Sequence, residues 1–139
     1  MMMELKTFAS PEVVAMRPTL ALAQDHIHVK SPFCGDLIEI LRANESAPDI
    51  AVLVDVRPTL AHFHAGFDEV YLVLDGSLTV RLFDPTAKET TQHVLSAHEA
   101  CVIPKWVHHQ ISNASFHNRL CVLCVPHFDS ADEVASSQL

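Results

Sequence analysis

Short apolar runs separated by turn residues fill the chain from residue 37 onward. Most of these runs are rich in β-branched residues, which is typical of strands. They predict strands at residues 37–41, 50–57, 69–74, 78–83, 90–95, 100–103, 108–113 and 120–125. Their spacing, about ten residues from one run to the next, is typical of an antiparallel sandwich or barrel. We therefore expect an all-β fold.

The strongest turn signal is Asp75-Gly76, which lies between two of these runs. It predicts a β-hairpin, because glycine tolerates the positive φ of a tight turn. The two ends of the chain have a different character. Residues 1–30 fit a short helix or an arm lying on the body, and the polar end fits a short helix or a frayed tail. The prediction is one domain, with an N-terminal arm at 1–30, a barrel at 31–128 and a C-terminal tail at 129–139.

Composition narrows the classes of function. A chain of 139 residues, 49% hydrophobic and 19% charged, can bury one core but not two. Nine Lys and Arg against seventeen Asp and Glu give a net charge of -8, so nucleic acid is not an expected partner. No secretory leader and no apolar stretch of membrane length is visible, so we expect a cytoplasmic protein without a membrane partner. Four cysteines are too few for a disulfide scaffold.

The position of certain histidines points to metal chemistry, because imidazole is the commonest metal ligand. Side chains two residues apart on a strand leave by the same face, so His62 and His64 can present their rings to one point. Glu69 opens the next predicted strand and can aim its carboxylate back at that point. A further imidazole follows a proline corner, where we prefer His109 to its neighbour His108. Together these residues predict a metal site.

These two segments resemble the two signature motifs of the cupin superfamily. Residues 62–76 match H-x-H-x4-E-x6-G, and residues 104–113 match P-x-G-x2-H-x3-N except at the glycine. The resemblance implies an antiparallel jelly-roll β-barrel with a divalent transition metal ion (Fe, Mn, Zn, Ni or Cu) in its mouth. Carried over by position, the implied metal ligands are His62, His64, Glu69 and His109.

The chain departs from the second motif at two places. Trp106 stands where glycine is usual, and His98-Glu99 stands where the motif usually opens with Gly-Asp. A bulky indole at a tight corner predicts either a different turn or a ring placed on the rim of the mouth. The departure leaves His108 open as the fourth ligand in place of His109.

Strand alternation also predicts what surrounds the metal. Tyr71 shares the inward face of Glu69 and is our candidate catalytic proton donor, with packing in the barrel core as the alternative. Arg57 and Arg81 can bind a substrate carboxylate if they point inward, although a strand arginine more often faces solvent. The apolar lining predicted for a small organic ligand is Val73, Phe83, Ile111 and Leu123.

The cysteine pair near the C-terminus resembles half of a zinc knuckle. Cys121 and Cys124 are three residues apart, so on a strand their thiols leave by opposite faces. The chain has no second pair to complete a zinc site. Core packing is therefore the better interpretation for both thiols.

The predicted site favours a small metalloenzyme of the dioxygenase, isomerase or cyclase class, acting on a carbonyl-, enol- or acid-bearing molecule. The alternative is a non-catalytic protein that binds or senses a small molecule through the metal. Tyr71, His108 and Glu99 are the titratable candidates beyond the ligands, and the binding alternative is favoured if all three face away from the metal. A metal-free shell is a third, weaker alternative. The resemblance also implies a homodimer.

Overall fold

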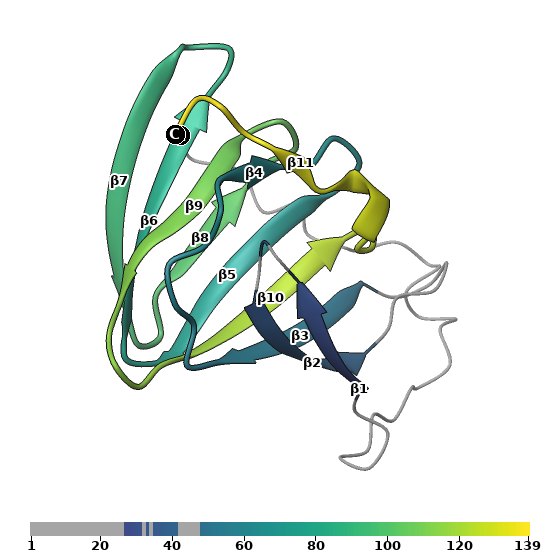
Figure 1. Ribbon diagram of the computed structural model, residues 1–139, viewed down its shortest axis with the longest axis vertical. Helices are drawn as coiled ribbons and strands as arrows, with labels where there is room; N and C mark the ends of the chain where they lie inside the picture. The colour runs from purple at the N-terminus through teal and green to yellow at the C-terminus, as the bar shows by residue number, and fades with distance from the viewer. Residues whose placement is uncertain (1–26, 32, 34, 42–47) are drawn as a thin grey trace, which may run out of the picture.

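The computed structural model describes residues 27–31, 33, 35–41 and 48–139, which form two antiparallel sheets around a common core (Figure 1). The six-stranded sheet has the order β1 (Ile27–Ser31), β2 (Gly35–Leu41), β3 (Asp49–Val54), β10 (Arg119–Val125), β5 (Asp68–Asp75) and β8 (Ala100–Ile103). The five-stranded sheet has the order β11 (Val134–Ala135), β4 (His62–Phe63), β9 (His108–Ala114), β6 (Ser77–Asp84) and β7 (Glu89–Ser96). The predicted all-β jelly-roll fold is confirmed.

The chain passes repeatedly from one sheet to the other, so strands far apart in sequence become neighbours. β10 lies between β3 and β5, and β9 lies between β4 and β6. All eight predicted strands are present. The strand predicted at 50–57 ends at Val54, because Asp55 takes a positive φ of 52° and turns the chain. Prediction missed three strands. One is β1, which lies mostly in the predicted arm, and the others are β4 and β11, which have two residues each and carry no periodic signal.

The Asp75-Gly76 turn is present, but the two strands that it joins do not form a hairpin. Gly76 has a φ of 78°, and a Cβ atom there would lie 2.4 Å from the His117 carbonyl oxygen. β5 continues in the six-stranded sheet and β6 in the five-stranded sheet, so this turn is a corner between the sheets. The local turn signal was correct, whereas strand pairing was decided by partners more distant in sequence.

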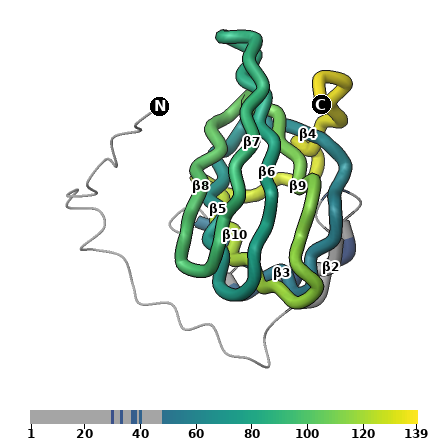
Figure 2. The backbone as a smooth tube through the Cα atoms, turned by 90° about the vertical axis from the view of Figure 1, so that its left-hand side faces the viewer, coloured from purple at the N-terminus to yellow at the C-terminus, as the bar shows by residue number. Residues whose placement is uncertain are grey.

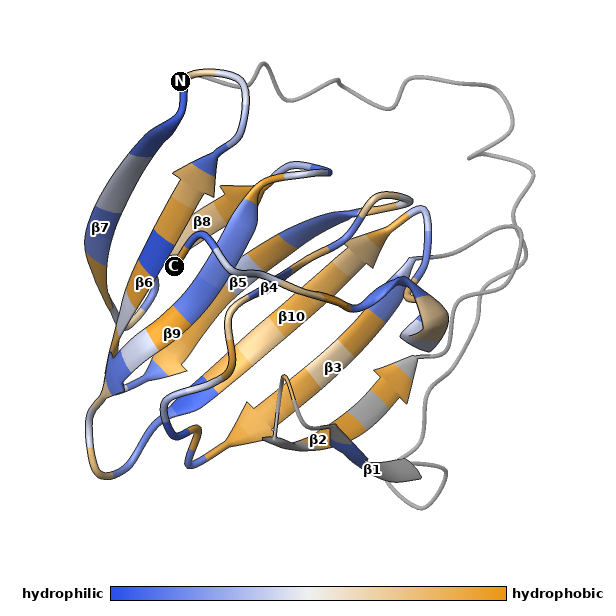
Figure 3. Ribbon diagram, turned by 45° about the horizontal axis from the view of Figure 1, so that its top comes forward, coloured by the Kyte–Doolittle hydropathy of each residue, from blue (hydrophilic) through white to orange (hydrophobic). Residues whose placement is uncertain are grey.

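The core lies between the inward faces of the two sheets. Burial alternates along β5, β6, β9 and β10, as expected for strands with one face inside. Apolar residues follow β3 and β10 in the six-stranded sheet (Figure 3). The fully buried aliphatic residues, each contributing roughly 1.5–3 kcal/mol of burial free energy, include Val73, Leu78, Val80, Ile103, Ile111 and Leu120.

The edges of the fold differ from the core. The β6–β7 hairpin extends beyond the other strands (Figure 2), and Leu95 is the buried residue of β7. The C-terminal segment forms a short 3-10 helix, η2 (Ser130–Asp132), and then returns as β11 beside β4. The arm predicted at 1–30 lies outside the described residues up to residue 26, and residues 27–31 form β1. The described residues contain no helix with the length and apolarity needed to span a membrane.

Candidate metal centre

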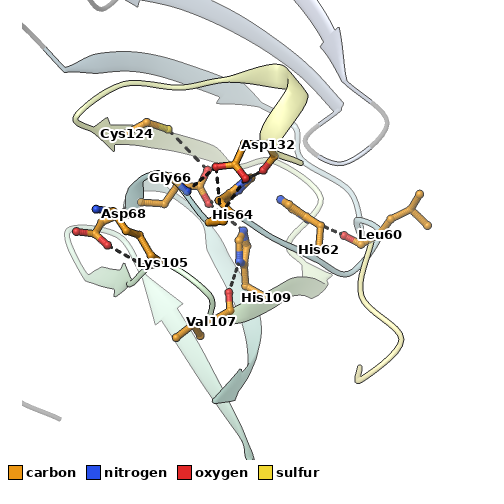
Figure 4. Close-up of polar contacts among 12 residues, drawn as sticks. Leu60, His62, His64, Gly66, Asp68, Lys105, Val107, His109, Cys124 and Asp132 are labelled. Carbon is orange, nitrogen blue, oxygen red and sulfur yellow. Dashed lines mark hydrogen bonds and ion pairs between the residues drawn. The ribbon is translucent and has the colours of Figure 1, made fainter. Parts of the chain in front are cut away.

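Three imidazoles and one carboxylate meet between the two sheets. His62 lies on β4, His64 follows that strand directly, Glu69 lies on β5, and His109 lies on β9. The potential ligand atoms of these four residues all lie within 4.8 Å of one another. All four side chains are buried, at 3% exposure or less. Figure 4 shows the three imidazoles turned toward one another.

Strand pairing and alternation explain this convergence. His62 pairs with His109 in the β4–β9 ladder, which places the two rings side by side with centroids 4.2 Å apart. Glu69 is on the buried face of β5 and pairs with Ile103 of β8 on one side and Cys124 of β10 on the other. The carboxylate therefore reaches the imidazoles from the opposite sheet.

The tautomer of each imidazole is fixed by the main chain. A carbonyl oxygen can only accept a hydrogen bond, so a ring nitrogen beside one must carry the proton. Each Nδ1 atom donates in this way, to Leu60 from His62 (3.0 Å), to Asp132 from His64 (2.8 Å) and to Val107 from His109 (3.2 Å). In the neutral rings, every Nε2 atom therefore points a lone pair into the centre.

With neutral rings, the four atoms that face the centre are therefore all hydrogen-bond acceptors, and none of them is a donor. Glu69 Oε2 lies 2.8 Å from His109 Nε2 and 3.2 Å from His64 Nε2. These atoms and His62 Nε2 have no hydrogen-bond partner when the rings are neutral. Buried acceptors without a partner are costly, and a carboxylate among lone pairs is repelled by them. A cation placed among the four atoms removes both penalties.

Protonation of the imidazoles cannot take the place of that cation at all three rings. Burial, together with the neighbouring His109, lowers the pKa of His62 to about 3, so this ring stays neutral near pH 7. Burial also opposes charge on His64, but its contact with Glu69 outweighs burial and raises the His64 pKa. Burial alone would raise the Glu69 pKa, yet His109 and His64 hold it far below its usual range. The carboxylate is therefore ionised, stabilised by positive charge that an imidazole neighbour or a bound cation can provide.

The donor set fits a divalent transition metal. Three neutral imidazoles and one carboxylate are suitable ligands for Zn, Fe, Mn, Ni or Cu. Each imidazole already makes the Nδ1 hydrogen bond that commonly supports a metal-bound histidine. The predicted residues His62, His64, Glu69 and His109 are thus brought together, and they fit a divalent metal site.

Two groups that prediction did not associate with the site lie against it. Cys124 is buried, as expected of a core thiol, but its Sγ also lies 3.8 Å from Glu69 Oε1. Asp132, in the tail, accepts the Nδ1 hydrogen of His64 through its carbonyl oxygen. Both contacts join residues more than fifty positions apart in sequence, so no local spacing could indicate them.

Of the three titratable candidates beyond the ligands, Tyr71 lies beside the site. Its ring is buried and edge-on to His109, with centroids 6.0 Å apart. His108 is on the outward face of β9, stacked on Phe63, and its Nδ1 lies 2.5 Å from Ser136 Oγ. Glu99 is exposed and accepts a hydrogen bond from a turn amide. The proton-donor role of Tyr71 stays a prediction.

Two of the four residues predicted as apolar lining face the core, and the other two face outward. Val73 and Ile111 are buried in the core, whereas Phe83 and Leu123 lie on the outer faces of their strands. Phe83 pairs with His108, and its ring packs against that outward imidazole with centroids 5.3 Å apart. Leu123 pairs with Val70, which alternates with the inward Glu69. Prediction chose the wrong parity on both strands.

The two arginines considered as substrate ligands do not point at the centre. Arg57 is exposed. Arg81 alternates with the buried Val80 and lies on the outer face of β6, where its guanidinium is 3.5 Å from Gln110 Oε1. No binding role for either residue is supported.

The two departures from the second motif keep the glycine-like backbone. Trp106 and His98 both have a φ of 71°, in the left-handed region that favours glycine. The Trp106 amide donates to the His64 carbonyl oxygen at 2.7 Å, and its exposed indole stacks on Phe63. The turn is therefore preserved, and the indole lies on the outside of the rim.

Comparison with known proteins gives information at the level of the fold. No family model matches the chain, and no curated protein sequence matches it. A variant of Pac13 from Streptomyces with uridine has a TM-score of 0.66 and 14% identity, over 88% of this chain and 96% of its own. Another structure names Pac13 a nucleoside dehydratase. A protein from Planctomyces limnophilus has a TM-score of 0.68 and 22% identity, over 86% of this chain and 98% of its own.

CapF from Staphylococcus aureus, a capsular polysaccharide assembling protein, has a TM-score of 0.63 and 18% identity. That match covers 79% of this chain and 34% of CapF, so the chain spans about a third of CapF. Pac13 and CapF are cupin-fold proteins. The chain has the cupin fold, as the two motifs predicted, and a fold of this kind does not by itself define a reaction.

Proposed function

We propose that this chain is a metal-dependent enzyme of the cupin type that acts on a small carbonyl-, enol- or acid-bearing molecule. His62, His64, Glu69 and His109 hold the metal. The proposal rests on one observation: four buried acceptor atoms face one another while the opposite nitrogen of every imidazole is engaged by a carbonyl. The reaction belongs to the dioxygenase, isomerase or cyclase class.

We infer the substrate class from the charge and surroundings of the site. A divalent ion with one carboxylate has a local charge of about +1, which favours anionic or enolisable ligands. Such an ion supplies Lewis-acid activation of a carbonyl, or dioxygen binding if it is redox-active. Val73 and Ile111 belong to the buried apolar core around the centre, so an electrostatic contact there is only weakly screened. Tyr71, beside His109, is the proposed proton donor.

Metal content tests the proposal directly. The chain purified without a histidine tag, with and without oxygen, is expected to contain about one equivalent of a divalent transition metal by elemental analysis. His62→Ala and His64→Ala are each expected to lose that metal, because each removes one of four ligands. His93→Ala is a matched control, since His93 is exposed on β7. Full occupancy in both ligand variants would end the four-ligand proposal.

The reaction class is tested with a substrate panel. Oxygen uptake is recorded with small phenols, diketones and thiol acids, and uptake in the presence of metal would select the dioxygenase class. Uridine joins the panel as a ligand for binding and dehydration assays, because it accompanies the similar Pac13 structure. Tightly held zinc without oxygen uptake would favour the isomerase or cyclase class.

A non-catalytic binding protein is the second candidate, because two of the three titratable groups considered for catalysis do not face the centre. His108 and Glu99 face away from the centre, which leaves Tyr71 beside it. Tyr71→Phe separates the two candidates, because it removes the hydroxyl and keeps the ring. An enzyme that uses this proton donor loses turnover by about 100-fold or more with little change in metal content. Unchanged turnover would remove Tyr71 from the mechanism.

The homodimer also stays a proposal. Its support is β7, which lies at the end of the strand order in its sheet with seven of eight residues exposed. A free strand edge of this kind is suited to pairing with a second chain. Light scattering is expected to give twice the mass of one chain, and a monomer at micromolar concentration would contradict the proposal.

A further inference from the structure

The C-terminal segment runs beside β4, which carries His62 and leads directly into His64. We define this segment, residues 128–136, as the C-terminal clasp. It begins where the Phe128 amide donates to Asp49 at 2.7 Å, and it ends where the Ser136 amide donates to Ala61 at 2.9 Å. Between these points, β11 pairs with β4 and places Ala135 opposite His62. Figure 1 shows η2 and β11 passing over the end of the barrel at β4.

Asp132 makes the contacts with the site from within the clasp. Its carbonyl oxygen accepts the Nδ1 hydrogen of His64 at 2.8 Å. Its carboxylate accepts hydrogen bonds from the main-chain amides of the two residues after His64, Ala65 at 2.9 Å and Gly66 at 2.6 Å (Figure 4). One residue thus fixes both the ring of His64 and the turn that leads from His64 toward Glu69.

This support differs from that of the other two imidazoles. The carbonyls that orient His62 and His109 come from residues two positions away on the same segment. The carbonyl that orients His64 comes from a residue 68 positions away. His62 and His109 therefore keep their partners as long as their own strands form, whereas His64 keeps its partner only while the clasp is docked.

The clasp has little burial of its own to hold it in place. None of the residues of η2 is buried, and both residues of β11 are exposed. A segment of this kind has low local stability, so its docking responds to whatever the site gains or loses. Phe128 adds an edge contact to Phe67, which itself stacks on His64 with ring centroids 4.2 Å apart. The contacts of Asp132, Phe128 and β11 thus join the clasp to His64, to Phe67 stacked on it, or to β4 just before it.

We propose that Asp132 is a positioning residue for the metal centre, and that docking of the clasp and binding of the metal stabilise each other. The inference rests on the proposed metal site. Because binding equilibria are reciprocal, a docked clasp strengthens metal binding by the factor with which the metal strengthens docking.

The first test compares zinc affinity in full-length variants by competition with a chromophoric chelator. Asp132→Ala keeps the main-chain carbonyl that accepts from His64, but it removes the carboxylate that anchors the clasp to the Ala65 and Gly66 amides. Because the clasp then docks less tightly, Zn²⁺ binding is expected to weaken by about 10- to 100-fold, the usual effect of losing a contact that supports a metal ligand. Asp132→Asn keeps one acceptor oxygen and is expected to lose less affinity. Asp84→Ala is the matched control, because the Asp84 carboxylate also accepts two turn amides, those of Thr86 and Ala87, on the distant β6–β7 turn.

The result that overturns the inference is Asp132→Ala with parental zinc affinity, even if its metal-free melting temperature falls. Such a variant would show a role in stability alone. If the parental chain itself binds no Zn²⁺, the proposed metal site fails and this inference fails with it. A weakened Asp132→Ala beside an unchanged Asp84→Ala supports the coupling.

A second measurement tests the reciprocal effect without changing the sequence. Zn²⁺ added to the parental chain is expected to slow amide hydrogen exchange in residues 130–136 by about tenfold or more, as in residues 62–66. The β6–β7 turn serves as an internal control and is expected to exchange at the same rate in both states. Slowing confined to residues 62–66 would show that the clasp is indifferent to the metal and would overturn the inference.

Discussion

The two ends of the barrel each bury a polar group, and they treat it in opposite ways. At one end, Asn118 is buried and its side-chain atoms are paired, since Oδ1 accepts from the Val56 amide and Nδ2 donates to the carbonyls of Val56 and Ser115. At the other end, Glu69 and three imidazoles face one another as acceptors. This fold satisfies a buried polar group where the role is structural. The group whose buried acceptors lack partners fits a cation, and its end of the barrel is the proposed functional end.

The largest expected effect is at the structural end. Asn118 joins the segments around Val56 and Ser115 into one corner of the barrel. Asn118→Ala leaves the Val56 amide and the carbonyls of Val56 and Ser115 without this partner, which is expected to lower the free energy of unfolding by about 3 kcal/mol. The loss is expected to be the same with and without metal, because the corner lies at the far end of β10 from Cys124 and Glu69. Urea denaturation measures it. Asn113→Ala, at an exposed position on β9, is the control and is expected to change stability little.

A metal-dependent loss from Asn118→Ala would contradict the separation of the two ends. It would mean that the corner and the metal centre belong to one cooperative unit for ligand binding.

The second effect belongs to the functional end. Chelation of the metal is expected to lower the free energy of unfolding by about 2.7 kcal/mol relative to a metal concentration one hundred times the Kd, since the ion binds only the native state. Thermal denaturation with and without chelator measures the change. Glu69→Gln is the control, because an amide is a poor replacement for the anionic ligand. If the chelator shifts Glu69→Gln as much as the parent, the ion binds elsewhere.

Zinc affinity is expected to depend on pH through His64. The pKa of this imidazole is raised in the metal-free protein, while the metal-bound ring carries no proton on Nε2. Protons therefore compete with the metal as the pH falls through that pKa, and affinity drops about tenfold per pH unit for each proton displaced. His62, with a pKa of about 3, displaces none near neutral pH. Titration at several pH values is expected to show fewer than three protons released, and a flat profile would contradict the raised pKa of His64.

Local patterns in the sequence predicted most of the strands and the four residues that the fold brings together as a candidate metal site. Alternation along one strand brings His62 and His64 to one face, and burial repeats every second residue on the long inner strands. Prediction failed where the answer depended on pairing between distant strands. The parity that turns Leu123 outward and Cys124 inward is set by the β10–β5 register, with Cys124 opposite Glu69. No spacing along the chain encodes that register.

The same limit explains why the contacts that support the candidate site were missed, while the four residues that form it were predicted to lie together. A motif records residues that must lie at fixed separations on one segment, and the H-x-H-x4-E spacing is of this kind. Asp132 reaches His64 from 68 positions away, through a tail whose polar composition predicted a short helix or a frayed end but no contact with the site. The residues of the candidate metal site could be predicted, but the contacts that orient them required the fold.

The smallest expected effect distinguishes two cysteines on one strand, one that contacts a proposed metal ligand and one that only packs. Cys124 and Cys121 are both on β10, but Cys124 faces inward, 3.8 Å from Glu69 Oε1, and Cys121 faces outward. Cys124→Ala removes a weak donor to the ligand carboxylate and is expected to weaken Zn²⁺ binding by less than about tenfold. Cys121→Ala is expected to leave zinc affinity unchanged, as measured by chelator competition. Both variants lose one sulfur atom from the same strand, so they are matched. Equal zinc affinities would show that the Cys124 thiol only fills space beside Glu69. The polar groups that affect the proposed metal site would then be the four ligands and Asp132.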